Sequence, residues 1–390
     1  MKGNREDIIY LDHAATSWPK PESVREAMLQ AMEMAGANPG RGSHYMAVQA
    51  SRVLFNTRRK LAELFNIHNP NDIVYAFNTT LALNMAIKGI VDSGDHIITT
   101  MMEHNSVRRP IEYLRQHKQV EVDYLPLDDH GQISISMLEQ TIRNHTKLIV
   151  VSHSSNLLGS IQPLEEIGRI AKEHQVHFLV DAAQSAGVLG IDVRRMGIDM
   201  LAFPGHKGLL GPQGTGGLYI HPSIDLEPLV HGGTGSQSEA IDQPTVRPDR
   251  YESGTPNTIG IAGLGAGVDY VLKMTTEQIY SHEWKLTQLL MEGLAQIPGI
   301  QILGPSLGEP RSGLVAFYSE KLDSAELAFK LDRKFGIAVR AGYHCTPLAH
   351  ESAGTAKQGA VRASFGVNSN EREVVTLLAA VRELVDEDLA

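Results

Sequence analysis

Five short apolar segments of this sequence end in side chains that could do chemistry. The segments span residues 73–77, 96–100, 148–151, 177–180 and 200–203. Apolar, β-branched runs of this length, with amphipathic segments between them, predict buried strands of a largely parallel sheet. In such a sheet a ligand lies outside the carboxyl ends of the strands. The groups that follow the five segments are Asn78-Thr79-Thr80, Glu103-His104-Asn105, Ser152 to Asn156, Asp181 with Gln184, and Gly205-His206-Lys207.

Each of these loops taken alone could be an ordinary polar connection, because loops are generally polar. Asn78-Thr79-Thr80 precedes the helical run 81–88, so its N–H groups and hydroxyls could bind an anion, although a simple helix cap fits equally well. Asp181 ends an apolar strand, where a carboxylate is costly unless a cation faces it.

Lys207 stands between Gly205-His206 and Gly208, close to a glycine-rich segment. A solvated loop lysine is the commoner case, but burial lowers the pKa of a lysine and makes it a nucleophilic amine. A reactive lysine, a carboxylate and an anion site together match what pyridoxal phosphate requires. The residues therefore favour a site for this cofactor at the sheet edge.

Cys345 is the only cysteine of the chain, which excludes an intrachain disulfide and a metal site built from several cysteines. Free cysteine is more often a small buried hydrophobic residue. This one lies in the polar loop 341–347 directly after His344, a residue that could act as base or cation. A thiolate forms more easily in such surroundings, so the loop is a candidate for a reactive thiol.

The length and the element pattern indicate how these groups are positioned. A chain of 390 residues suggests two domains. The alternation of strands and helices from about residue 70 to 220 predicts an α/β domain, and the glycine- and proline-rich stretch 231–257 predicts a long functional loop. Beyond residue 270 we expect a compact α+β domain, with helices over 275–296, 324–334 and from 370 onward, and strands at 300–303, 314–318, 337–340 and 360–364.

Composition excludes several other classes of protein. The net charge of −10 argues against a nucleic-acid partner, because phosphate binding needs a basic surface. No apolar run is long enough to span a membrane, and the charged start is unlike a secretory signal, so we expect a cytoplasmic protein. Neither a Walker motif nor a His-Glu-x-x-His motif occurs, and no metal is expected.

The order of the motifs resembles the cysteine desulfurases, pyridoxal-phosphate enzymes of the class V aminotransferase type. The segment around Cys345 is similar to group II, the Suf-type branch that includes selenocysteine lyases. The resemblance runs from Tyr10 to Ser364 and rests on the motifs Asn78-Thr79-Thr80, Glu103-His104-Asn105, Asp181-Ala-Ala-Gln184, Gly205-His206-Lys207, Ser253-Gly-Thr-Pro-Asn257 and Arg340-Ala-Gly-Tyr-His-Cys345.

This resemblance implies a fold-type I transferase with a mostly parallel central sheet, flanking helices and a smaller α+β C-terminal domain. Residues 16–260 would form the large, cofactor-binding domain. Residues 1–15 and 261–390 would form the small domain, which carries the Cys345 loop.

The resemblance also implies roles at the cofactor. Lys207 would bind pyridoxal phosphate covalently and shuttle protons, and Asp181 would keep the ring nitrogen protonated. The other implied contacts are His104 stacked on the ring, Gln184 and Asn156 near the ring oxygen and the substrate, and Thr79 or Thr80 with His206 at the phosphate.

Three further residues have implied roles away from the ring. Thr255 would reach the phosphate of a neighbouring subunit, which implies a homodimer. Arg362 would pair with the substrate carboxylate, although a surface salt bridge is the plain reading of any single arginine. His44, in Arg41-Gly-Ser-His44, would line the substrate cleft.

The implied reaction converts L-cysteine to L-alanine, with a persulfide formed on Cys345 and passed to a sulfur-acceptor protein, for example in iron–sulfur cluster assembly. A selenocysteine lyase shares nearly all of these residues. The same residues would also fit an aminotransferase or C–S lyase, in which Cys345 is a spectator, or a non-catalytic cofactor-binding protein. Two residues depart from the family pattern: Pro204 stands where a hydroxyl residue is common, and Tyr343 stands where a second histidine is common.

Overall fold

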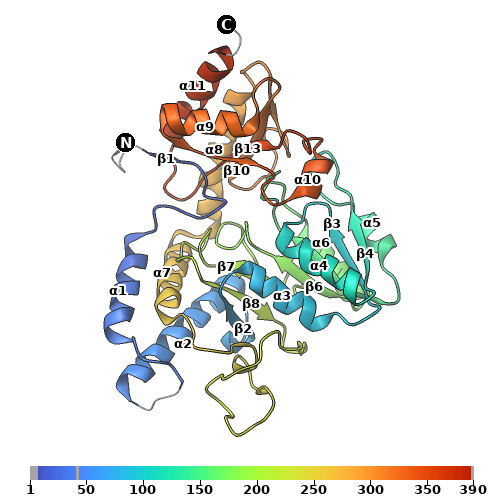
Figure 1. Cartoon of the computed structure of the whole chain (residues 1–390), viewed down its shortest axis with the longest axis vertical. Helices are drawn as coiled ribbons and strands as arrows, with labels where there is room; N and C mark the ends of the chain where they lie inside the picture. Colours follow the sequence, from blue (N-terminus) through green and yellow to red (C-terminus); the bar gives the residue numbers. More distant parts are fainter. Residues whose placement is uncertain (1–7, 41–43, 388–390) are drawn as a thin grey trace.

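The computed structural model describes residues 8–40 and 44–387. The chain folds around a seven-stranded sheet and a four-stranded sheet, each with its own helices (Figure 1). The seven-stranded sheet has the order β2-β8-β7-β6-β5-β3-β4. Its strands are β2 (Ile73–Ala76), β3 (His96–Thr100), β4 (Glu121–Leu125), β5 (Thr146–Ser152), β6 (His177–Asp181), β7 (Met200–Pro204) and β8 (Gly216–Ile220).

The large sheet is mostly parallel, as the sequence predicts. Only β8 runs antiparallel to its neighbours, β2 and β7. The other adjacent strands pair in parallel, with Ser152 of β5 opposite Asp181 of β6. Their carboxyl ends therefore meet at one edge, where the predicted polar loops follow them.

Helices cover both faces of this sheet and bury the apolar side chains of its strands. One core lies around Val74, Ile97 and Leu179, the other around Ile98, Val180 and Phe203. The helices are α1 (Glu22–Met34), α2 (Tyr45–Phe65), α3 (Thr79–Ile90), α4 (Asn105–His117), α5 (Ile135–Thr141), α6 (Leu164–Glu173) and α7 (Thr258–Met274). In the described part of the chain, no helix is long and apolar enough to cross a membrane.

The smaller part is an antiparallel sheet packed against helices, as expected for an α+β unit. Its strand order is β12-β13-β10-β9. The strands are β9 (Ile300–Ile302), β10 (Leu314–Ser319), β12 (Arg340–Gly342) and β13 (Ala360–Ser364). The helices are α8 (Thr276–Leu294), α9 (Ser324–Phe335), α10 (Pro347–Ser352) and α11 (Glu371–Glu387). Its core gathers Leu290, Phe317, Leu331 and Val381.

The N-terminal segment joins the smaller part, as Figure 1 shows. β1 (Ile9–Tyr10) pairs in parallel with β11 (Ile337–Ala338). Between residues 221 and 257 the only regular elements are short, such as the 3₁₀ turn η3 (Asp249–Tyr251). The domain division after residue 260 stays a prediction, and the burial of Leu264 and Val268 of α7 in the core of the large sheet favours a later division.

Candidate functional site

A pocket opens at the carboxyl edge of the large sheet, where β2, β5, β6 and β7 end. Pocket walls include Met102, Ser106, Ser152 and Pro204. Eight of the predicted site residues also line it, namely Thr79, Thr80, His104, Asn156, Asp181, Gln184, His206 and Lys207. The loops that follow separate strands thus form one site.

The amine of Lys207 is enclosed, and its surroundings favour the neutral form. Burial lowers its pKa to about 8, and Arg362 acts in the same direction. Asp181 has the opposite shift, because burial of its carboxyl raises its pKa to about 6. An amine with a pKa of about 8 is about half neutral at pH 8, and the neutral form is a nucleophile for a carbonyl group.

A second buried carboxyl group, Glu103, supports the strand that ends beside Asp181. It accepts hydrogen bonds from the N–H and hydroxyl of Ser152 and from the hydroxyl of Thr100, at 2.6–3.2 Å. Burial raises the pKa of Glu103 to about 7. Ser152 stands opposite Asp181 in the sheet, so this network fixes the strand next to the carboxylate.

The ring of His104 is held by hydrogen bonds in a neutral form. His104 precedes α4 and caps it, with Nδ1 accepting the N–H of Ser106 at 3.0 Å. The hydroxyl of Ser106 lies 2.9 Å from the same nitrogen and 2.7 Å from the hydroxyl of Thr80. Burial lowers the pKa of His104 to about 4, with Lys207 and Arg340 adding to the effect. The neutral ring therefore carries its proton on Nε2.

The start of α3 lies at one end of the pocket. Asn78 caps this helix through its side chain, which accepts the N–H of Leu81 at 2.9 Å. Thr79 and Thr80 occupy the first two helical positions, whose N–H groups lack partners within the helix. Burial lowers the pKa of His206 to about 4, and Pro204 presents a ring where a hydroxyl is common. Both the N-cap and the anion-site interpretations of this motif fit the geometry.

Arg362 reaches the site from the small sheet. Its side chain is almost completely buried, and Nη2 donates to Asp12 Oδ1 at 2.8 Å. Nη1 donates to the backbone oxygen of Asn156 at 2.9 Å. The charges of Arg362 and Arg340 both lower the pKa of Lys207 and of His104, because these two cations lie close to the pocket.

The loop that carries Cys345 contacts the same edge of the pocket. Asn156 Nδ2 donates to the backbone oxygen of His344 at 2.7 Å, and the N–H of Asn105 donates to that of Cys345 at 2.9 Å. The Cys345 side chain is exposed. His344 does not supply a cation to it, because burial lowers the pKa of this imidazole to about 3.

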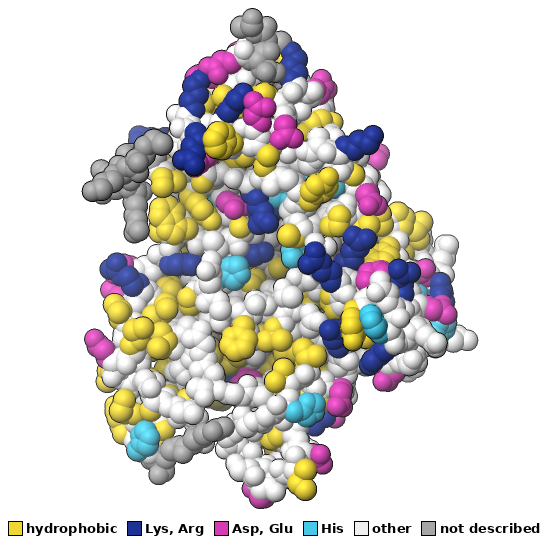
Figure 2. Space-filling model, in the orientation of Figure 1, with side chains coloured by type: hydrophobic (Ala, Val, Ile, Leu, Met, Phe, Trp, Pro, Cys, Tyr) yellow, Lys and Arg dark blue, Asp and Glu magenta, His cyan; other side chains and the backbone are white. Residues whose placement is uncertain are grey.

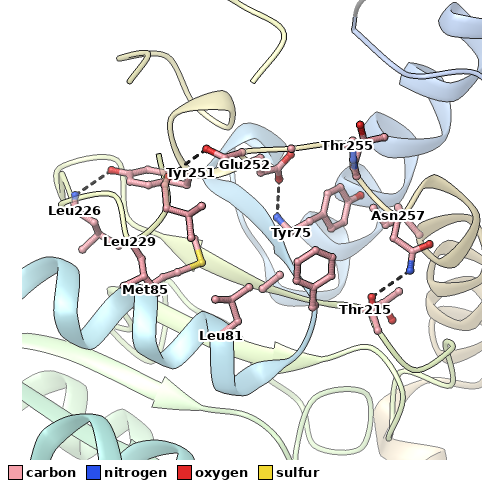
Figure 3. Close-up of a pocket in the computed structure, with 18 of the residues that line it drawn as sticks. Tyr75, Leu81, Met85, Thr215, Leu226, Leu229, Tyr251, Glu252, Thr255 and Asn257 are labelled. Carbon is pink, nitrogen blue, oxygen red and sulfur yellow. Dashed lines mark hydrogen bonds between the residues drawn. The ribbon is translucent and has the colours of Figure 1, made fainter. Parts of the chain in front are cut away.

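Gln184 lines the pocket, and two other predicted residues lie elsewhere. Gln184 Nε2 donates to the backbone oxygen of Ala14 at 3.1 Å. Thr255 borders a second, more apolar pocket with Leu81 and Met85, and Figure 3 shows it on the opposite side from Met85. His44 caps α2 and is absent from the pocket lining, and residues 41–43 of its motif lie outside the described residues.

Sequence reasoning left three contributors to the site without a role. Asp12 pairs with Arg362, Ser106 links Thr80 to His104, and the N–H of Asn105 contacts the cysteine loop. Asn105 closes the motif that begins at Glu103, and Ser106 follows directly after it. Their roles depend on contacts across the fold, for which the sequence carries no local signal.

The residues present fit a pyridine cofactor with an aldehyde and a phosphate. Asp181 is buried at the pocket wall with the N–H of Ala183 as its hydrogen-bond donor. Among the described residues, no lysine, arginine or histidine forms an ion pair with it. An ionised carboxylate that is buried without a cationic partner costs free energy. The protonated ring nitrogen of such a cofactor would supply that partner. The amine of Lys207 suits the aldehyde, the neutral imidazole of His104 suits the ring face, and the start of α3 suits the phosphate.

Comparisons with known proteins agree with this geometry. The family model described as aminotransferase class-V matches residues 9–377. A probable cysteine desulfurase of Methanothermobacter thermautotrophicus is 36% identical, with 97% of this chain and 95% of the relative covered. A cysteine desulfurase of Salmonella dublin is 33% identical, with 97% and 93% covered.

Solved structures give the same result. The apo structure of a cysteine desulfurase from Thermococcus onnurineus superposes with a TM-score of 0.93 at 35% identity, covering 98% of this chain and 96% of the other. The cysteine desulfurase CsdA from Escherichia coli has a TM-score of 0.88 at 28% identity, covering 100% and 96%. This protein therefore belongs to the class-V aminotransferase family, and within it to the cysteine desulfurases.

Proposed function

We propose that the protein is a pyridoxal-phosphate-dependent desulfurase of L-cysteine, in which Cys345 accepts the sulfur. One observation carries the proposal: the loop of the only cysteine is hydrogen-bonded to Asn156 and Asn105, at the rim of the pocket that holds Lys207 and Asp181. The family comparison supports the reaction class.

The pocket residues would hold the cofactor in one orientation. Lys207 would bind its aldehyde, Asp181 its ring nitrogen and the start of α3 its phosphate. When bound, pyridoxal phosphate supplies an electron sink for the substrate's α-carbon. His104 would cover the ring face as a neutral imidazole, because burial holds its pKa well below neutral pH.

The chain's own groups bind the substrate and move its proton. Arg362 would bind the substrate carboxylate through its planar guanidinium, which Asp12 orients. The neutral amine of Lys207 would remove the α-proton, since its lowered pKa makes a large fraction of it free base near pH 8.

Sulfur transfer would take place at Cys345. Its thiolate attacks the substrate sulfur, so that an S–S bond forms and the substrate C–S bond breaks. The electron pair of that bond stays on carbon and takes up a proton, which gives L-alanine and a persulfide on Cys345. A sulfur-acceptor protein would then take the terminal sulfur from this exposed position.

Intact-mass analysis of the cofactor-loaded protein tests this function. After L-cysteine is added, the mass should rise by one sulfur atom on Cys345, and alanine should appear. Cys345→Ala should abolish both changes while cofactor absorbance remains. Full alanine release by Cys345→Ala, or no mass gain in a loaded sample, would contradict the proposed role. L-selenocysteine in the same assay measures the alternative substrate.

We also propose that two chains assemble as a homodimer through the second pocket. That pocket joins Thr255 to apolar side chains of β2, α3 and the loop before η3 (Figure 3). Phe77, which lines this pocket, is 60% exposed, and Figure 2 shows hydrophobic side chains gathered in the lower middle of the face in view. Exposed apolar patches of this kind mark protein interfaces.

A substitution in this pocket separates the dimer from a monomer. Phe77→Asp should shift the protein toward monomer in sedimentation velocity. Phe329→Asp, on α9 at a matching 61% exposure, serves as the control and should leave the mass unchanged. A wild-type protein that sediments as a monomer would refute the assembly.

A further inference from the structure

The tip of the cysteine loop is a tight turn with an unusual backbone. The N–H of Thr346 donates to the backbone oxygen of Tyr343 at 3.0 Å, so His344 and Cys345 are the two central residues of the turn. Both have positive φ, 50° and 59°. Positive φ at both central positions is the geometry that glycine and asparagine usually provide. A histidine and a cysteine hold it here at a cost in free energy, so other contacts must stabilise it.

Two hydrogen bonds from the large sheet's loops reach the two strained residues. Asn156 Nδ2 donates to the backbone oxygen of His344 at 2.7 Å. The N–H of Asn105, the first residue of α4, donates to that of Cys345 at 2.9 Å. We call these two bonds the loop clamp. The N–H of a first helical residue has no partner within its helix, so the clamp also satisfies that group.

The turn is anchored on its other side by buried rings of the smaller part. His344 is 3% exposed and stacks on His350 with ring centroids 5.8 Å apart. Burial lowers the pKa of both imidazoles, so they pack as neutral rings. Tyr343 donates its hydroxyl to the backbone oxygen of Ala356 at 2.8 Å. These contacts hold the base of the loop, and among the described residues the hydrogen bonds from its tip to the loops of the large sheet are the two of the clamp.

Both donors of the clamp belong to the site itself. Asn105 follows His104 in the sequence. The backbone oxygen of Asn156 accepts a hydrogen bond from the guanidinium of Arg362. The side chain of Asn156 also lines the pocket. Docking of the cysteine loop thus depends on Asn156, which lines the pocket, and on Asn105, which stands between the lining residues His104 and Ser106.

We propose that Asn156 and the N–H of Asn105 are positioning groups that dock the Cys345 turn onto the pocket rim through the loop clamp. The role in catalysis rests on the proposed function, since a docked turn fixes where the thiol meets the substrate sulfur. The docking itself is a property of the polypeptide, because the clamp joins only residues of the chain.

Hydrogen exchange of the cofactor-free protein tests the docking directly. Asn156→Ala removes one donor, and Asn156→Asp replaces it with a group that cannot donate. Asn105→Pro removes the other donor at a first helical position, where proline is well tolerated. The preceding His104 has φ −65° and ψ 153°, which is compatible with a following proline.

Each variant should speed exchange in the peptide 341–348 by about fivefold, the effect of losing one net hydrogen bond. Asn71→Ala, before β2 at the opposite sheet edge, and Glu371→Pro, at the first position of α11, are the matched controls and should not change it. Exchange in 341–348 that stays at the wild-type rate in folded Asn156 and Asn105 variants would overturn the clamp, as would faster exchange of equal size across the whole chain.

A second measurement connects docking with sulfur transfer. In the cofactor-loaded protein, Asn105→Pro should keep cofactor absorbance and lower the rate of mass gain on Cys345 after L-cysteine is added. An unchanged rate together with faster exchange would refute the catalytic part of the proposal. If wild type itself gains no sulfur, the proposed function fails, while the exchange result still decides the docking.

Discussion

Arg362 donates Nη2 to the carboxylate of Asp12 over 2.8 Å, which joins two residues 350 positions apart in the sequence. The Arg362 side chain is 1% exposed, whereas the Asp12 side chain is 23% exposed. A single ion pair therefore links the N-terminal segment, β13 and the pocket rim. It sets the direction in which the arginine faces the site.

Loss of the Asp12 charge should destabilise the protein. Asp12→Asn leaves the buried Arg362 cation without its partner, and such a loss costs several kcal/mol at a fully buried pair. Because Asp12 is partly exposed, we expect a decrease in the free energy of unfolding of about 1–3 kcal/mol, measured in urea. Glu173→Gln, which breaks the exposed pair with Arg169, should leave the unfolding midpoint unchanged. A midpoint for Asp12→Asn equal to wild type would contradict the structural role.

Asp181 should make the cofactor-free protein less stable as the pH rises. Its pKa is about 6 when folded, above the value near 4 of an unfolded chain, so the folded state binds the proton more tightly. Its destabilising contribution is absent below about pH 4, grows from pH 4 to 6 and is complete above about pH 7. Asp181→Asn should therefore stabilise the cofactor-free protein by about 1–3 kcal/mol at pH 8, and by less at pH 5.

Denaturation of both proteins at the two pH values measures this difference. The same variant should bind pyridoxal phosphate more weakly, because the amide cannot hold a protonated ring nitrogen as a carboxylate does. A gain of equal size at pH 5 and pH 8 would show that the Asp181 carboxyl has an ordinary pKa.

Lys207 should give cofactor loading a characteristic pH dependence. Only the neutral amine attacks an aldehyde, and burial lowers the pKa of Lys207 to about 8. The rate of covalent loading should rise about tenfold per pH unit below pH 8 and level off above it. Absorbance after mixing cofactor-free protein with pyridoxal phosphate follows the reaction, and borohydride should trap the adduct on Lys207. A rate still rising at pH 10 would indicate an unperturbed lysine.

Much of the fold was predictable from the sequence because its signals are local. The apolar runs 96–100 and 177–180 predicted β3 and β6, and the capping pattern from Thr275 to Gln278 predicted the start of α8. β8 was missed, since the glycines around Gly216 read as a loop. A Cβ at Gly216 would lie 2.7 Å from the backbone oxygen of Phe203, and a Cβ at Gly217 would lie 2.6 Å from the Phe203 ring, so the close packing of this strand requires glycine at both positions.

The site was predictable only in part. Residues that follow strands, such as Asp181 and Lys207, are placed by the parallel sheet and converge as expected. The pairing of Asp12 with Arg362, and of Asn105 with the cysteine turn, depends on how two separate sheets pack together. Burial of His344 likewise follows from packing against His350, so its neutral state could not be read from the neighbouring residues.

Gly205 should be required both for stability and for the placement of Lys207. A Cβ atom at this position would lie 2.1 Å from Thr215 Oγ1 and 2.9 Å from its Cβ. Threonine is stiff at its first side-chain torsion, so the backbone must move instead. Overpacking of this kind costs about 1–3 kcal/mol. Because Lys207 is two residues farther along, Gly205→Ala should also slow covalent cofactor loading.

Gly190 offers a matched control for this substitution. A Cβ at Gly190 would have its nearest neighbour at 3.9 Å, so Gly190→Ala should leave both unfolding and loading unchanged. Urea unfolding of the cofactor-free proteins and absorbance after cofactor addition measure the two effects separately. If Gly205→Ala unfolds and loads like Gly190→Ala, the contact with Thr215 does not set the position of Lys207. A variant that unfolds earlier but loads at the wild-type rate would limit Gly205 to a role in stability.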